Sequence, residues 1–248
     1  MYLHIMNKLI SSKTRMMVFD MAGTVINEGG LVYKTLYQTL DQFHVPVCEN
    51  EIKYWHGANK YEALDYFLKR SVMKNGAIFH IDKYNITDLE RDEFHFLRPT
   101  LHHLFDKNLK DVYFSKNSVK FIDDNLPSLF CKIRENNIII ALNSGYSKEI
   151  QEIILHNLHF KEIIDDYISS DVVQKGRPEP YMINTLMRRN NIIVPEQVIK
   201  FGDTKNDILE GQNARCGESI GVLSGAANRD DFESVGATII LDSVMKID

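Results

Sequence analysis

The sequence predicts an α/β fold in which a parallel sheet is covered by helices on both faces and interrupted by a mostly helical insert. Three observations support this prediction. Short apolar runs alternate with amphipathic helical patterns in the second half of the chain. The most apolar runs end in polar residues, as buried parallel strands do at a ligand crevice. A long stretch of helical spacing separates the first run from the others.

The predicted strands are brief and apolar. Residues 16–19 (Met-Met-Val-Phe) form the first run, which ends in Asp20. Later strands are predicted at 138–142, 167–168, 198–201, 219–223 and 238–241. Between them, one apolar helix face is carried by Ile150, Ile153, Ile154 and Leu158, and a further helix begins near Pro180. This alternation predicts a sheet whose carboxyl edge carries the polar residues.

Residues 31–116 are predicted to form the helical insert. Leu36, Leu40 and Phe43 repeat at helical spacing, as do Ala63, Leu64, Phe67 and Leu68. The α/β core domain is therefore expected to consist of residues 1–30 together with 117–248.

Composition limits the functional classes. The chain has 248 residues and a formal net charge of -5, which disfavours a general nucleic-acid binder. Its three cysteines, Cys48, Cys131 and Cys216, include no CxxC pair, which is typical of a reducing compartment. No stretch approaches the ~18 apolar residues of a membrane span, and residues 1–10 lack a signal-peptide pattern. We therefore expect a cytoplasmic protein with no nucleic-acid or membrane partner.

The residues at and near the predicted strand ends suit phosphoryl transfer. The Asp20 carboxylate can act as a nucleophile and form an aspartyl-phosphate. Ser144 and nearby backbone amides can hold non-bridging oxygens, and a fixed cation such as Arg177 can neutralise developing charge. Asp203 and Asp207 offer the hard oxygen ligands that Mg²⁺ prefers. The metal would shield the incoming phosphorus group from repulsion by Asp20.

With these residues in place, the chain resembles the haloacid dehalogenase superfamily over nearly its whole length. Its motifs occur here in order as Asp20-Met21-Ala22-Gly23-Thr24, Ser144-Gly145, Arg177-Pro178-Glu179-Pro180 and Gly202-Asp203-Thr204-Lys205-Asn206-Asp207. The resemblance implies a Rossmann-like core, Mg²⁺ as cofactor and a small phosphorus-containing metabolite as substrate. It also implies that the insert is a cap domain, and it suggests a homodimer formed through that cap.

One departure from the superfamily pattern narrows the resemblance. Phosphatases of the superfamily usually carry a second Asp two residues after the nucleophile, where this chain has Ala22. In this respect the chain is similar to phosphonoacetaldehyde hydrolase and to phosphonatase-like proteins. Further matches are the segments 31–34 (Leu-Val-Tyr-Lys) and 221–226 (Gly-Val-Leu-Ser-Gly-Ala). Lys60, in the segment 57–60 (Gly-Ala-Asn-Lys), matches the lysine that forms an imine with the substrate aldehyde. The preceding His56 departs from that pattern, which usually has Met.

The absence of an Asp at position 22 and the presence of Lys60 both suit cleavage of a phosphorus–carbon bond. Cleavage of a phosphorus–carbon bond leaves a carbanion and no leaving oxygen. An Asp at position 22, whose role is to protonate a leaving oxygen, would therefore serve little purpose. A protonated imine on Lys60 would supply an electron sink. Hydrolysis of a small phosphonate or phosphate metabolite, with phosphonoacetaldehyde as leading candidate, is therefore the preferred prediction. The alternatives are a phosphomonoesterase and a non-catalytic protein that binds metal and phosphate.

The predicted site falls into three groups. The catalytic residues are Asp20, Lys60, Ser144 and Arg177, and the metal-binding residues are Asp20, Ala22, Asp203 and Asp207. The substrate-contacting residues are Ala22, Gly23, Gly57, Gly145 and Lys175. Two alternatives stay open: Lys175 could replace Arg177 as the motif cation, and Lys60 could contact an anion only or have no role.

Overall fold

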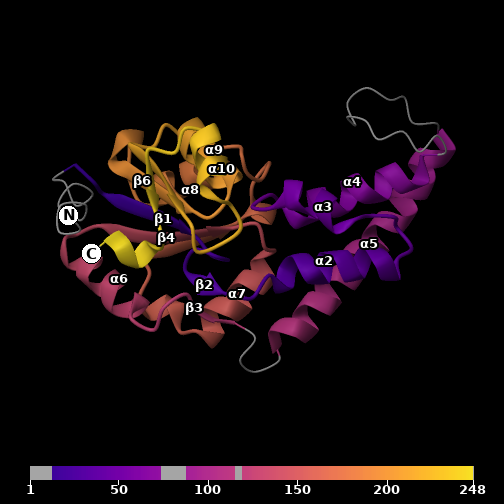
Figure 1. Cartoon of the computed structure of the whole chain (residues 1–248), viewed down its shortest axis with the longest axis horizontal. Helices are drawn as coiled ribbons and strands as arrows, with labels where there is room; N and C mark the ends of the chain where they lie inside the picture. Colours follow the sequence, from indigo (N-terminus) through magenta and orange to yellow (C-terminus); the bar gives the residue numbers. More distant parts are fainter. Residues whose placement is uncertain (1–12, 74–87, 115–118, 248) are drawn as a thin grey trace.

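A computed structural model describes residues 13–73, 88–114 and 119–247 of the protein. It places an α/β sheet domain at one end of the molecule and a group of helices at the other (Figure 1). The predicted boundary at residues 116 and 117 falls outside the described residues, so the limits of the domains stay a prediction.

The sheet is parallel throughout. Its strand order is β5 (Asp166–Ser169), β4 (Ile139–Ser144), β1 (Met16–Asp20), β6 (Val198–Gly202), β7 (Glu218–Val222) and β8 (Ile239–Leu241). β1 lies between β4 and β6 and is fully buried, as its apolar sequence predicted. The predicted α/β fold class is confirmed, and Asp20 lies at the carboxyl end of an inner strand.

Side chains alternate along β1 and contact different helices on the two faces of the sheet. Met17 and Phe19 share one buried cluster with α6 (Leu126–Glu135), α7 (Lys148–Asn157) and the 3₁₀ helix Val244–Ile247. Met16 and Val18 share a second cluster with α8 (Tyr181–Arg189). α9 (Lys205–Asn213) packs on β6 and β7, and Phe232 of α10 (Arg229–Ser234) lies against Gly221 in β7. Short 3₁₀ helices complete the connections at Phe160–Glu162, Ser170–Val172 and Pro195–Gln197.

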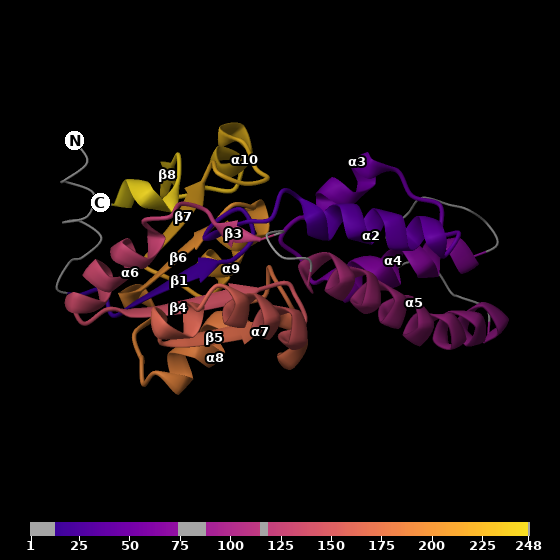
Figure 2. The same ribbon diagram turned by 90° about the horizontal axis from the view of Figure 1, so that it is seen from below.

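The insert is helical, as the spacing predicted. It contains α2 (Leu31–Gln42), α3 (Glu49–Ile52), the 3₁₀ helix Lys53–Trp55, α4 (Lys60–Val72) and α5 (Asp88–Phe114). α2 and α4 both pack on α5, and Figure 2 shows this group beside the sheet domain. Among the described residues, none of the helices combines the length and apolarity that a membrane span requires.

Some elements escaped prediction. β2 (Ile26–Asn27) and β3 (Lys120–Phe121) form an antiparallel pair that is too short to show a period-two pattern. α6, α9 and α10 were also missed. α9 and α10 carry buried polar or few apolar residues, so their helical faces are not marked by hydrophobicity alone.

Truncation of Phe19 should destabilise the protein strongly. Its ring stacks on Phe201 with centroids 4.6 Å apart and lies 5.0 Å from Phe130. Phe19→Ala should lower the free energy of unfolding by ~3–5 kcal/mol, because it opens a cavity at the centre of the sheet. Phe96→Ala is the matched control, since Phe96 is 79% exposed, and it should change stability by less than ~0.5 kcal/mol. Denaturant unfolding would measure both, and equal effects would contradict this description of the core.

Candidate active site

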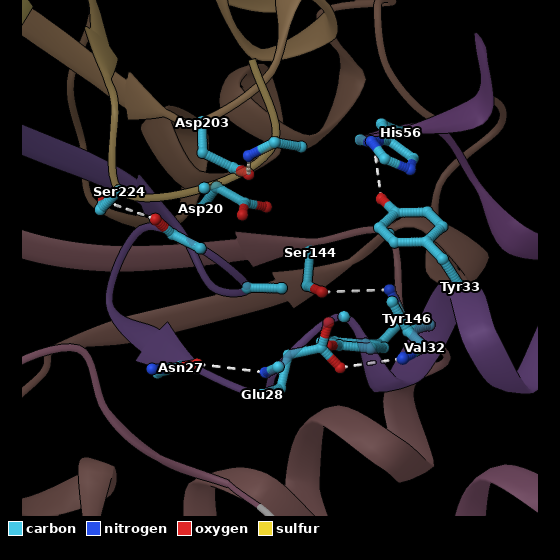
Figure 3. A pocket seen from close by; sticks show the side chains of 18 of the residues that line it. Asp20, Asn27, Glu28, Val32, Tyr33, His56, Ser144, Tyr146, Asp203 and Ser224 are labelled. Atoms are coloured by element: carbon cyan, nitrogen blue, oxygen red, sulfur yellow. Dashed lines mark hydrogen bonds between the residues drawn. The ribbon is translucent and has the colours of Figure 1, made fainter. Parts of the chain in front are cut away.

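A cavity of about 320 Å³ opens at the carboxyl edge of the sheet, where it meets the helical insert. Asp20 ends β1, Ser144 ends β4, and Asp203 follows β6, so neighbouring strands bring all three into the cavity wall. Figure 3 shows Asp20 and Asp203 at one end, Glu28 and Tyr146 at the other, and Ser144 between them. The edge predicted to hold the site is therefore the one where the cavity lies.

Arg177 forms ion pairs with three acidic residues. Its Nη1 atom lies 2.7 Å from Asp20 Oδ1 and 3.0 Å from Asp207 Oδ1, and its Nε atom lies 3.1 Å from Glu210 Oε2. The guanidinium is buried, which opposes its charge, but Asp207, Asp20 and Glu210 outweigh burial and raise the pKa of Arg177. The residue therefore keeps its positive charge and holds the Asp20 carboxylate in one orientation.

Three buried carboxylates form a cluster suited to a cation. Asp20, Asp203 and Asp207 each offer an oxygen, and these oxygens lie within 4.8 Å of one another. Burial first, and then the charges of Asp20 and Asp207, raise the pKa of Asp203 well above its ordinary value. Burial also raises the pKa of Asp20, although Arg177 opposes that shift. An all-oxygen donor set with excess negative charge fits Mg²⁺, which would relieve the repulsion.

A second row of polar residues supports this cluster from inside the sheet domain. Lys200 is fully buried, and its Nζ lies 2.9 Å from Asp207 Oδ1 and donates to Asn143 Oδ1 at 2.7 Å. Asn143 in turn donates to both oxygens of Glu210, at 3.0 and 2.8 Å. Sequence reasoning gave none of these three residues a role. A lysine inside the apolar run 198–201 was the available signal, because a buried charge requires a partner.

Lys60 brings a buried amine into the same cavity. It begins α4, and its Nζ donates to Ala58 O at 2.8 Å and to the Tyr33 hydroxyl at 3.2 Å. Burial, and next the charge of Arg177, lower the pKa of Lys60 to about 8. The neutral amine, which is the nucleophilic form, is therefore reached at a lower pH than in an exposed lysine. Tyr33, part of the segment 31–34 that carried the resemblance, is a contact that sequence reasoning did not identify.

The insert reaches the cavity through a very close backbone contact. Gly57 has a φ of +76°, and a Cβ at this position would lie 2.2 Å from Thr204 Oγ1. Gly57 N donates to Tyr33 at 2.9 Å, and Asn206 Nδ2 donates to His56 O at 2.8 Å. Only glycine fits here, so the segment that precedes Lys60 sits directly on the segment that carries Asp203 and Asp207.

The other end of the cavity is polar and was not predicted. Glu28 is only 5% exposed, and its Oε2 accepts a hydrogen bond from Val32 N at 3.0 Å and another from the Tyr113 hydroxyl. The hydroxyls of Tyr113 and Tyr146 lie 2.9 Å apart. Burial raises the pKa of Glu28. Glu28 directly follows β2, in the segment that leads from Asp20 to the insert. Its closeness in sequence to the motif 20–24 was the one signal that could have indicated a place in the site.

Most predicted site residues meet in this cavity. Its wall includes all the predicted catalytic residues and most of the predicted substrate contacts, namely Asp20, Ala22, Gly23, Gly57, Lys60, Ser144, Gly145 and Arg177. Lys175 does not belong to it. The Lys175 side chain is 57% exposed and pairs with Glu179 at 3.3 Å, so Arg177 is the cation beside Asp20. The metal role of Ala22 stays a prediction.

The chain is similar in sequence to several known proteins. A sequence model of the family described as haloacid dehalogenase-like hydrolase matches residues 17–217. A phosphonoacetaldehyde hydrolase of Bacteroides fragilis is 33% identical over 130 residues, which cover 51% of this chain and 47% of the relative. A phosphoglycolate phosphatase of Vibrio cholerae is 23% identical over 60% of this chain and 63% of its own length. The chain therefore spans about half to two-thirds of these curated relatives.

A solved structure supports the fold. The crystal structure of a phosphonoacetaldehyde hydrolase-like protein from Oleispira antarctica superposes with a TM-score of 0.71 at 19% sequence identity. The superposition covers 94% of this chain and 89% of that one. At this identity the likeness concerns the fold alone.

The metal site can be tested without turnover. Asp203→Asn should weaken Mg²⁺ binding by at least ~10-fold, because a hard anionic ligand becomes a neutral amide. Asp242→Asn, at an exposed carboxylate outside the cavity, should bind Mg²⁺ as the wild type does. Isothermal titration calorimetry with Mg²⁺ would measure both variants. Unchanged Mg²⁺ affinity in Asp203→Asn would show that the cation binds elsewhere.

Proposed function

This chain belongs to the haloacid dehalogenase-like hydrolase family, and on that premise we propose that it is a Mg²⁺-dependent hydrolase that cleaves the phosphorus–carbon bond of a small phosphonate aldehyde. Phosphonoacetaldehyde is the leading candidate. The observation that carries the proposal is the buried Lys60 amine, which lines the same cavity as Asp20 and has a pKa lowered to about 8.

The phosphorus end of the reaction belongs to Asp20 and its neighbours. The Asp20 carboxylate, oriented by Arg177 at 2.7 Å, attacks phosphorus and forms an aspartyl-phosphate. Arg177 and the Ser144 hydroxyl face the charge that develops on the non-bridging oxygens. When bound, Mg²⁺ held by Asp20, Asp203 and Asp207 supplies further charge neutralisation. Water then hydrolyses the aspartyl-phosphate and restores Asp20.

The carbon end belongs to Lys60. Its neutral amine condenses with the substrate aldehyde, one water leaves, and the imine nitrogen takes a proton from solvent to give the protonated imine. When the phosphorus–carbon bond breaks, its electron pair moves into this imine and gives an enamine. The hydrogen bonds from Nζ to Ala58 and Tyr33 orient the amine inside the cavity. Ala22 fits this reaction because no alkoxide oxygen has to be protonated.

A second candidate function is hydrolysis of a small phosphomonoester. The buried acid Glu28 at the far end of the cavity favours it, because an ester needs a proton donor that Ala22 cannot provide. The likeness to a phosphoglycolate phosphatase points the same way. In this reaction Lys60 would contact an anionic group of the substrate and form no covalent bond.

Replacement of Lys60 separates the two candidates. If Lys60 forms the imine, Lys60→Arg should be as inactive as Lys60→Ala on phosphonoacetaldehyde, because a guanidinium cannot condense with an aldehyde. We expect both variants to lose several orders of magnitude in kcat. The wild-type rate should rise as pH increases through about 8, as the amine of Lys60 loses its proton. Phosphate release would be measured across pH.

Borohydride trapping supplies the control. Reduction in the presence of phosphonoacetaldehyde should leave a covalent adduct on Lys60, found by peptide mass spectrometry, and none on the exposed Lys53. Asp20→Asn should still give the adduct while it releases no phosphate. An active Lys60→Arg variant together with no adduct would contradict phosphorus–carbon cleavage and leave the ester reaction.

A further inference from the structure

One acid in the cavity takes no part in the steps assigned to Asp20 and Lys60. Glu28 lies in the wall of the cavity that contains Asp20 and Lys60, and it is only 5% exposed. Figure 3 places it on the far side of Ser144 from Asp20. An apical leaving group on a phosphorus atom bound at Asp20 departs on the side opposite the attacking oxygen. The leaving group is therefore directed away from Asp20, toward the end of the cavity that Glu28 lines.

The other titratable groups in the described wall are occupied or unsuited to donate a proton. Asp20 is the nucleophile, Asp203 belongs to the cation cluster, and Arg177 stays charged. Lys60 is bonded to the substrate carbon in the imine reaction and contacts an anionic group of the substrate in the ester reaction. Burial and the charge of Lys60 lower the pKa of His56 to about 4, so its ring carries no extra proton near neutral pH. Two further wall residues, Tyr33 and Tyr146, have pKa values raised well above 10.0 by burial, which makes them weak acids.

We propose that Glu28 is the proton donor to the leaving atom, taking the part of the acid that is missing at Ala22. The inference rests on the proposed function, because it needs Asp20 to attack phosphorus. It assigns a catalytic role to a residue on the loop that follows the nucleophile strand, eight positions beyond Asp20 in the sequence.

The protons balance through a full cycle. With an ester, the Asp20–phosphorus bond forms, the phosphorus–oxygen bond breaks, and the oxygen takes the proton of Glu28. Water then attacks the aspartyl-phosphate, the Asp20–phosphorus bond breaks, and phosphate leaves with both protons of that water, while the Glu28 carboxylate regains its proton from solvent. With a phosphonate aldehyde, the same proton goes to the terminal carbon of the enamine, and the resulting imine is hydrolysed to release Lys60. Either way Glu28 ends as it began.

Contacts around Glu28 fit an acid with a fixed orientation. The Oε2 atom of Glu28 accepts hydrogen bonds from Val32 N and from the Tyr113 hydroxyl. Tyr113 comes from α5 and Val32 from α2, so the insert holds the acid in place. Burial raises the pKa of Glu28, against the lowering effects of Tyr113, Val32, Lys60 and Tyr146. The protonated form therefore persists to higher pH than in an exposed glutamate.

Leaving-group dependence tests the inference on esters. Glu28→Gln keeps the shape of the side chain but cannot donate an acidic proton. On an alkyl phosphate, whose alkoxide is a poor leaving group, the variant should lose roughly 100-fold or more in kcat. On 4-nitrophenyl phosphate, whose phenolate leaves without a proton, it should stay within ~3-fold of the wild type. Asp20→Asn should abolish both activities, which separates the two roles.

Product timing tests the inference on phosphonoacetaldehyde. Wild type should release phosphate and acetaldehyde at equal rates. Glu28→Gln should release phosphate in a burst of about one equivalent per site, with acetaldehyde appearing slowly, because the enamine carbon waits for its proton. The matched control is Glu152→Gln, since Glu152 is a half-buried glutamate of α7 outside the cavity wall, and it should behave as the wild type.

The contrary outcomes are equally definite. Equal losses on the alkyl and 4-nitrophenyl esters would mean that Glu28 only maintains the structure of the cavity. Full activity of Glu28→Gln on every substrate would place the proton donor elsewhere. If Asp20→Asn and Glu28→Gln were both as active as the wild type, the proposed function itself would fail.

Discussion

The ion pair between Arg177 and Asp20 is the interaction on which the candidate site depends. Four buried carboxylates, those of Asp20, Asp203, Asp207 and Glu210, surround the buried cations Arg177 and Lys200. If all are ionised, negative charge exceeds positive charge in a region sheltered from water, which is costly to maintain. The excess lies beside Asp20 and Asp203, where a divalent cation would offset it. A cation bound at this edge of the sheet would therefore couple metal affinity to fold stability.

Close packing fixes the position of the insert relative to the acidic cluster. Gly57 contacts Thr204, and Thr204 in turn holds Asp207, since its backbone N–H donates to Asp207 Oδ2 at 3.2 Å. A side chain on Gly225 would also collide with Asp203, because its Cβ would lie 2.1 Å from Oδ2. The positions of Lys60 and of the acidic cluster are thus set by backbone contacts that tolerate little displacement. The same contact fixes the position of the Lys60 segment relative to the acidic cluster.

The strand ends could be predicted from sequence because each of three apolar runs stops one or two residues before a residue of the candidate site. Asp20, Ser144 and Asp203 follow buried strands, and parallel pairing brings such ends together. Glu28, Tyr33 and Lys200 could not be assigned in this way. Their positions depend on how the insert folds back over the sheet and on which face of β6 a side chain points to, and neither shows in local periodicity. Arg177 and Lys175 look equivalent in the sequence, and only the path of the loop separates the buried one from the exposed one.

The central claim is that the Asp20 carboxylate bonds directly to phosphorus. Beryllium trifluoride, a mimic of a phosphoryl group on a carboxylate, tests it most directly when its bound fluorine atoms are observed by ¹⁹F NMR in the presence of Mg²⁺. We expect bound-state resonances in the wild type and none in Asp20→Asn, because the amide cannot complete the beryllium coordination. The same resonances in both proteins would contradict covalent catalysis by Asp20.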